Sequence, residues 1–145
     1  MSPEGQADLV FELGQIRKEV AVLNRMLGRR RSLGRDEVRV RAAASSLQSI
    51  YNGMERMLQT VLMEKGSSVP EGPSSHSDLL DTAAALRVVS AGLVDSLREL
   101  MGFRHFYRHS YGFMIDHEQL NPLLRGVEKV VDQFARELHL PAGGA

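Results

Sequence analysis

Apolar residues near the N-terminus recur at alternating intervals of four and three, the spacing of one stripe along an α-helix. The stripe consists of Leu9, Leu13, Ile16, Val20, Leu23 and Leu27, and Gly28 ends it. A second stripe contains Ala43, Leu47, Ile50, Met54, Met57 and Val61. Asp36 is its expected N-cap and Gly66 its stop. Two long helices joined by a short turn predict an antiparallel hairpin.

The second half of the chain also has helical spacing. Residues 66–77 are rich in Gly, Pro and Ser and predict an exposed loop. A short helix is expected from about Ser77 to Leu86, capped by Ser77 or Asp78, and another from about Ser90 to His109. Periodicity does not decide whether these two are separate or one bent helix.

The last predicted helix runs from about Glu118 to Leu138. Its apolar stripe consists of Leu120, Leu123, Val127, Val130, Phe134 and Leu138. Residues 141–145 are expected to be a frayed tail. No segment alternates as a strand does, so the predicted fold is all-α, an up-down bundle of four to five helices in one domain over residues 1–140.

Composition narrows the function classes. The chain has 145 residues, 43% hydrophobic and 25% charged, as expected of one soluble domain. It has no cysteine, which excludes disulfides, thiolate zinc sites and a cysteine nucleophile. The N-terminus lacks the pattern of a signal peptide and no apolar run is long enough to cross a membrane, so we expect a cytoplasmic protein. The net charge of +0 argues against a surface that binds nucleic acid everywhere.

The segment 102–112 (GFRHFYRHSYG) concentrates cations, histidines and tyrosines at the end of a predicted helix. His105 and His109 are four residues apart and so share a helical face, where they offer two ligands to one metal ion. Neither Asp nor Glu lies between them, and Arg104 and Arg108 oppose a third cation nearby. We therefore predict no metal. A second interpretation is an ordinary solvated helix end, where a cation such as protonated His109 is favoured.

The third interpretation is acid–base cleavage of a phosphodiester. Cleaving RNA without metal requires a base, an acid and a fixed cation for the developing phosphorane charge. His109 suits the role of base or acid, because the ordinary pKa of histidine is near working pH. Arg104 suits the role of the fixed cation, because a guanidinium matches phosphate oxygens. Five helical residues rotate by about 140°, so the two converge only if the helix ends before His109 or a second copy completes the site.

Arg104, His109 and Tyr111 form an Arg-x4-His-x-Tyr pattern that resembles the signature of the HepT toxins, a branch of the all-α HEPN ribonucleases. The stretch 51–55 (YNGME) resembles the Tyr-x-x-x-Glu segment of the family's second helix, and residues 76–80 (HSDLL) resemble the start of its third. Two departures occur: His105 stands where many members have asparagine, and Ser75 where an aromatic residue often precedes the histidine.

The resemblance implies a metal-independent endoribonuclease toxin, without cofactor, acting as a homodimer on RNA such as tRNA or mRNA. Arg104 and His109 would be catalytic. Tyr111 matches the tyrosine that the antitoxin, a minimal nucleotidyltransferase of the MntA type, modifies with AMP. Supporting residues would be His105, Arg108, Tyr51 and Glu55. The alternatives are a catalytically inactive dimeric binding module for such a partner, or a structural bundle with an incidental motif.

Tyr51 and Glu55 are four residues apart and share a face of the second predicted helix. They either form an interhelical contact or support the catalytic arginine from a facing helix. Arg25 to Arg41 is the other unusual segment, with seven arginines against Asp36 and Glu37, about five net positive charges. This basic turn is either merely solvated, a track for an RNA backbone, or a docking site for an acidic antitoxin face.

Overall fold

The computed structural model describes residues 1–111 and 114–141, and within these ranges the chain forms five helices and no strand. The helices are α1 (Pro3–Leu27), α2 (Glu37–Glu64), α3 (Ser75–Ala85), α4 (Ala91–His109) and α5 (His117–Glu137). The predicted all-α class is confirmed. Of the predicted frayed tail, residues 142–145 lie outside the described residues.

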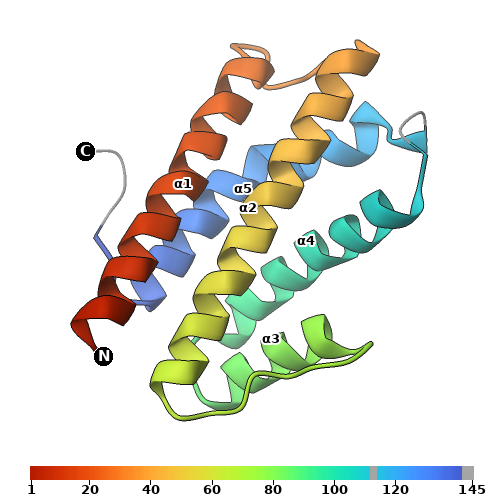
Figure 1. Ribbon diagram of the computed structural model, residues 1–145. Coiled ribbons are helices and arrows are strands. Elements are labelled where there is room, and N and C mark those ends of the chain that lie inside the picture. The colour runs from red at the N-terminus through yellow and green to blue at the C-terminus, as the bar shows by residue number, and fades with distance from the viewer. Residues whose placement is uncertain (112–113, 142–145) are drawn as a thin grey trace.

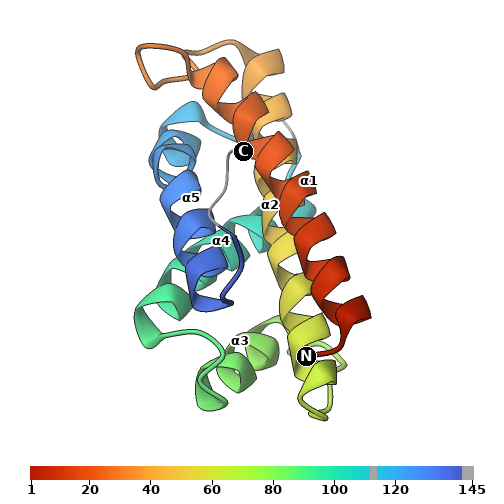
Figure 2. The same cartoon turned by 90° about the vertical axis from the view of Figure 1, so that its left-hand side faces the viewer.

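The helices pack in two layers. α1 and α2 run antiparallel side by side as the predicted hairpin (Figure 1), and α4 and α5 form a second layer against them (Figure 2). The short α3 lies beside α2 and α4. α2 contacts all four other helices, so its faces bring distant parts of the sequence together. Both predicted stripes of the hairpin are buried in one continuous core.

The pairs α1–α2 and α4–α5 are each joined at one end by a hydrogen bond from a serine hydroxyl to a glutamate carboxylate. The Ser2 hydroxyl caps α1 and donates to Glu64 at the end of α2, over 2.5 Å. The Ser90 hydroxyl caps α4 and donates to Glu137 at the end of α5, over 2.8 Å. The predicted cap of α2 is also confirmed, because the Asp36 carboxylate accepts a hydrogen bond from the backbone of Arg39.

The predicted start of the third helix was wrong. α3 begins at Ser75, with Ser74 as its N-cap, and not at Ser77 or Asp78. Several serines in a row are acceptable caps, so local sequence does not choose between them. The earlier start places His76 on the face of α3 that meets α2. α3 and α4 are separate helices, because the chain reverses at Arg87, whose φ is +57°.

The predicted inner stripe of α5 is shifted by a small rotation. Leu120, Val127 and Phe134 are buried as expected, while Leu123 and Val130 are only half-buried. Leu124 and Val131 take the inner positions instead. The reason is geometric, since a straight helix drifts relative to a strict spacing of four and three residues.

Candidate functional site

The predicted catalytic segment forms the end of α4, which remains helical through His109. The side chains therefore stand in two rows, with Arg104 and Arg108 in one row and His105 and His109 in the other. The two histidine rings are 4.6 Å apart between centroids, and both residues are exposed. Because α4 does not end before His109, unwinding does not bring Arg104 and His109 together in one chain, and of the two alternatives that the sequence left open only a second copy remains.

Arg104 is held by a residue that sequence reasoning did not select. Its Nε donates a hydrogen bond of 2.8 Å to Oδ1 of Asn52 on α2. Arg104 is half-buried, and its two terminal nitrogens make no hydrogen bond or ion pair within residues 1–111 and 114–141. A guanidinium fixed through Nε keeps its outer edge available for two phosphate oxygens. Asn52 belongs to the YNGME stretch, but the sequence alone does not show that it contacts Arg104.

Glu55, three residues after Asn52 on α2, forms a second pair with His76. Nδ1 of His76 lies 2.8 and 2.9 Å from the two carboxylate oxygens of Glu55. The carboxylate is buried, with 7% of the side chain exposed, while 40% of the imidazole side chain is exposed. The Glu55 side chain thus makes an interhelical contact with α3, one of the two outcomes that the sequence left open.

Tyr51 packs behind this pair. Burial raises the pKa of its hydroxyl far above the usual range, the charge of Glu55 raises it further, and Arg104 and Arg98 lower it in part. The hydroxyl lies near Glu55 without meeting hydrogen-bond geometry to any residue of the described chain. Tyr51 is therefore a neutral phenol buried between a carboxylate and two guanidinium groups, and it is closed to solvent.

Tyr111 lies two residues beyond the end of α4 and is 73% exposed. Its backbone carbonyl accepts a hydrogen bond of 2.9 Å from the Met114 amide. Tyr107 differs, because it is partly buried and its ring lies 6.0 Å from that of Phe103. Of these two tyrosines near the end of α4, Tyr111 is the more accessible to a modifying enzyme.

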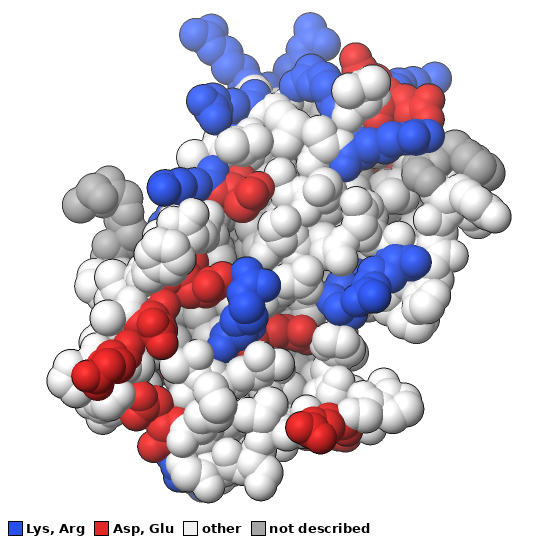
Figure 3. All heavy atoms as spheres, in the orientation of Figure 1, with Lys and Arg blue, Asp and Glu red and all other residues white. Residues whose placement is uncertain are grey.

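The basic turn, residues 25–41, is fixed against α5. Asn121 accepts a hydrogen bond of 3.2 Å from the Leu33 amide, and Nε of Arg125 donates to the Arg31 carbonyl over 2.7 Å. Lys and Arg side chains gather at this upper end of the molecule (Figure 3). Because α5 begins shortly after Tyr111, the basic turn and the end of α4 meet the same end of α5. Sequence alone had left that proximity open.

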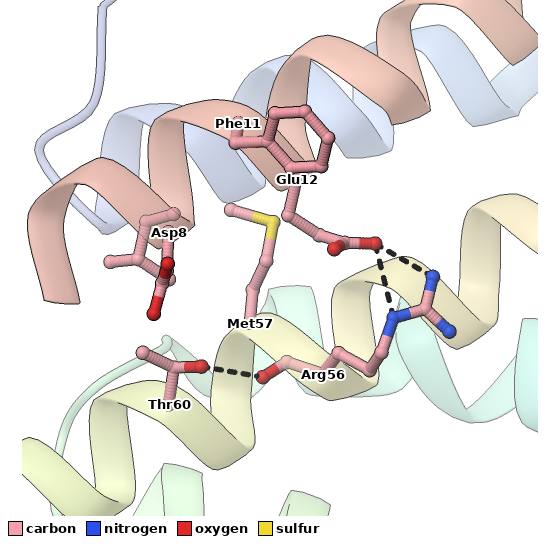
Figure 4. Close-up of a pocket in the computed structure, with 7 residues that line it drawn as sticks. Asp8, Phe11, Glu12, Arg56, Met57 and Thr60 are labelled. Atoms are coloured by element: carbon pink, nitrogen blue, oxygen red, sulfur yellow. Dashed lines mark hydrogen bonds and ion pairs between the residues drawn. The ribbon is translucent and has the colours of Figure 1, made fainter. Parts of the chain in front are cut away.

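In the described ranges, no group of three His, Asp or Glu side chains could hold a metal ion. A groove between α1 and α2 is lined by Asp8, Phe11, Met57 and Thr60, and its Glu12 and Arg56 are paired over 2.6 Å (Figure 4). No helix in the described part of the chain is long and apolar enough to cross a membrane.

The fold and the end of α4 together define an all-α protein with an Arg-x4-His-x-Tyr segment, whose arginine and histidine lie on α4 and whose tyrosine lies two residues beyond it. A family model described as HepT-like protein matches residues 42–140, more than half of the chain. The chain therefore belongs to the HepT-like family of the HEPN superfamily. Searches of curated proteins and of solved structures give no match.

Proposed function

We propose that this protein is a metal-independent endoribonuclease toxin that acts as a homodimer. The observation that carries the proposal is Arg104, a half-buried guanidinium oriented by Asn52 with its outer edge unoccupied in the described chain. Such a group is preorganised to neutralise charge on a phosphate as it develops. Membership of the HepT-like family supports RNA as the source of that phosphate.

The geometry of α4 supports the proposed dimer. Arg104 and His109 are separated by about 140° around one continuous helix, so one phosphate does not meet both from the same chain. In the proposed dimer, a two-fold axis beside this helix would bring His109 of one copy opposite Arg104 of the other. Each dimer then has two equivalent sites, each built from both copies.

The proposed reaction transfers a phosphoryl group within the RNA. A base removes the proton of a ribose 2′-hydroxyl, the 2′-oxygen bonds to phosphorus, and the bond from phosphorus to the 5′-oxygen breaks. An acid protonates the departing 5′-oxygen, which leaves a 2′,3′-cyclic phosphate and a 5′-hydroxyl end. His109 serves as one of the two proton-transfer groups, and Arg104 stabilises the phosphorane.

Incubation of purified protein with tRNA and with mRNA, in buffer containing chelator, tests this function. The wild type should cleave RNA, while Arg104→Ala and His109→Ala should lose at least about 100-fold in rate, as expected for removal of a charge clamp or an acid–base group. His139→Asn is the matched control, because His139 is exposed beyond α5. Equal cleavage by wild type and His109→Ala would show that His109 is not catalytic.

We further propose that an MntA-type nucleotidyltransferase silences the enzyme by adding AMP to Tyr111. The exposure of Tyr111 and its position next to α4 support this role. AMP there adds negative charge and bulk close to the substrate phosphate. Tyr111→Phe should remain toxic when the antitoxin is co-expressed, while Tyr107→Phe should still be neutralised. Full neutralisation of Tyr111→Phe would exclude Tyr111 as the essential acceptor.

A further inference from the structure

One face of α2 positions two side chains from two different helices. Asn52 and Glu55 are three residues apart, so they are neighbours on that face. Asn52 accepts the hydrogen bond from Arg104 of α4, and Glu55 contacts His76 of α3. Arg98 of α4 joins the same cluster, because its Nη1 donates to the Ser77 hydroxyl over 3.3 Å. Arg104 and His76 are therefore attached to adjacent positions within one chain.

The contact between Glu55 and His76 has the form of an oriented acid–base pair. A buried carboxylate that engages Nδ1 fixes the ring and leaves Nε2 as the nitrogen that exchanges protons with a substrate. Within residues 1–111 and 114–141, Nε2 of His76 makes no hydrogen bond. The imidazole is part-exposed while its carboxylate partner is buried, so His76 can reach a ligand and Glu55 cannot.

The proposed reaction needs two proton-transfer groups, and His109 supplies one of them. We propose that His76 is the second catalytic histidine and that Glu55 is its positioning residue, acting in the same copy as Arg104. This inference rests on the proposed ribonuclease function. Each site of the dimer would then combine Asn52, Glu55, His76 and Arg104 from one copy with His109 from the other.

The proton balance assigns complementary states to the two histidines. One imidazole enters neutral, takes the 2′-hydroxyl proton at a ring nitrogen and becomes an imidazolium. The other enters as an imidazolium and gives its proton to the 5′-oxygen as the bond from phosphorus to that oxygen breaks. Glu55 fixes the ring of His76 through Nδ1. It makes no bond to the substrate.

The expected result for His76→Gln is a fall in kcat of about 10²- to 10⁴-fold, the usual contribution of a general acid or base. His139→Asn should match wild type. Glu55→Gln preserves the size of the side chain but removes its charge, so its effect on kcat should be smaller. Circular dichroism melts of each variant show whether the bundle still folds.

A conservative replacement separates a positioning role from a merely structural one. Glu55→Asp keeps a carboxylate that can engage Nδ1 of His76, so it should recover part of the kcat that Glu55→Gln loses. The KM for RNA should be unchanged in both variants, because Glu55 makes no bond to the substrate. A merely structural role would give both variants the same kcat per folded molecule as wild type.

The outcomes distinguish this inference from the function on which it rests. If wild type cleaves RNA, His109→Ala is inactive and folded His76→Gln matches wild type, His76 is not catalytic and the ribonuclease function stands. If folded His76→Gln is slow but folded Glu55→Gln has the kcat of wild type, Glu55 is not a positioning residue. If wild type cleaves no RNA, both the ribonuclease function and the catalytic role of His76 are wrong.

Discussion

Gly53 of α2 packs tightly against Ile16 of α1, which makes it a sensitive test of the packing that supports the site. A Cβ added there would lie 2.8 Å from Cγ1 and 2.9 Å from Cδ1 of Ile16, against 3.4–4 Å for ordinary contact. Ile16 is 2% exposed, so it has little room to move. Overpacking of this kind costs about 1–3 kcal/mol. The gain in helix propensity from Gly to Ala offsets about 1 kcal/mol of that cost.

Gly53→Ala is therefore expected to lower the free energy of unfolding by about 1 kcal/mol, or the melting temperature by about 2–4 °C. Gly14→Ala is the matched control, because Gly14 is in α1 and a Cβ added to it would have nothing within 4 Å. That variant should gain about 0.5–1 kcal/mol. Urea unfolding followed by circular dichroism measures both. If Gly53→Ala is as stabilising as Gly14→Ala, α1 and α2 do not pack tightly at Gly53.

Three further predictions test separate parts of the account. Asn52→Ala removes a hydrogen bond to a charged group, worth about 1.5–3 kcal/mol, so kcat should fall about 10- to 100-fold with KM less affected; an unchanged kcat would contradict the role of Asn52. Replacing exposed Arg29, Arg30 and Arg35 by Ser should reduce the slope of log K for RNA binding against log salt concentration by about 2. Arg136→Ser at the far end of α5 should leave that slope unchanged. Burial opposes ionisation of Glu137, but hydrogen bonds from Gln133 and Ser90 outweigh it and lower the pKa below 4.5. Because the pKa of Glu137 is lower in the folded state than in the unfolded state, the resulting stabilisation is present above pH 4.5 and is lost in acid. In urea titrations, the free energy of unfolding of Ser90→Ala should therefore fall less between pH 6 and pH 3 than that of wild type.

The helices were predictable because their signals are local. The stripes from Leu9 to Leu27 and from Ala43 to Val61 repeat for several turns, and Asp36 and Gly66 mark where the second one begins and stops. The start of α3 was not predictable, because Ser74, Ser75 and Ser77 are equivalent as local caps. Contacts with α2, which lie outside any local window, select the earlier start.

The site could be predicted only in part, for a related reason. Arg104, His109 and Tyr111 are close in sequence, so their spacing is informative before any fold is known. Asn52 and His76 are far from them along the chain, and each has an ordinary polar side chain. Their proposed roles rest on the way α2 packs against α3 and α4, which pairs Asn52 with Arg104 and His76 with Glu55.

The central claim is that Arg104 of one copy and His109 of its partner form one ribonuclease site. Mixing Arg104→Ala with His109→Ala, each inactive alone, tests it directly after the subunits are allowed to exchange. A mixed dimer keeps one site with both groups intact, so an equal mixture should recover about a quarter of the wild-type cleavage rate. A mixture that stays inactive under conditions where wild type cleaves RNA and subunits exchange would contradict the shared site.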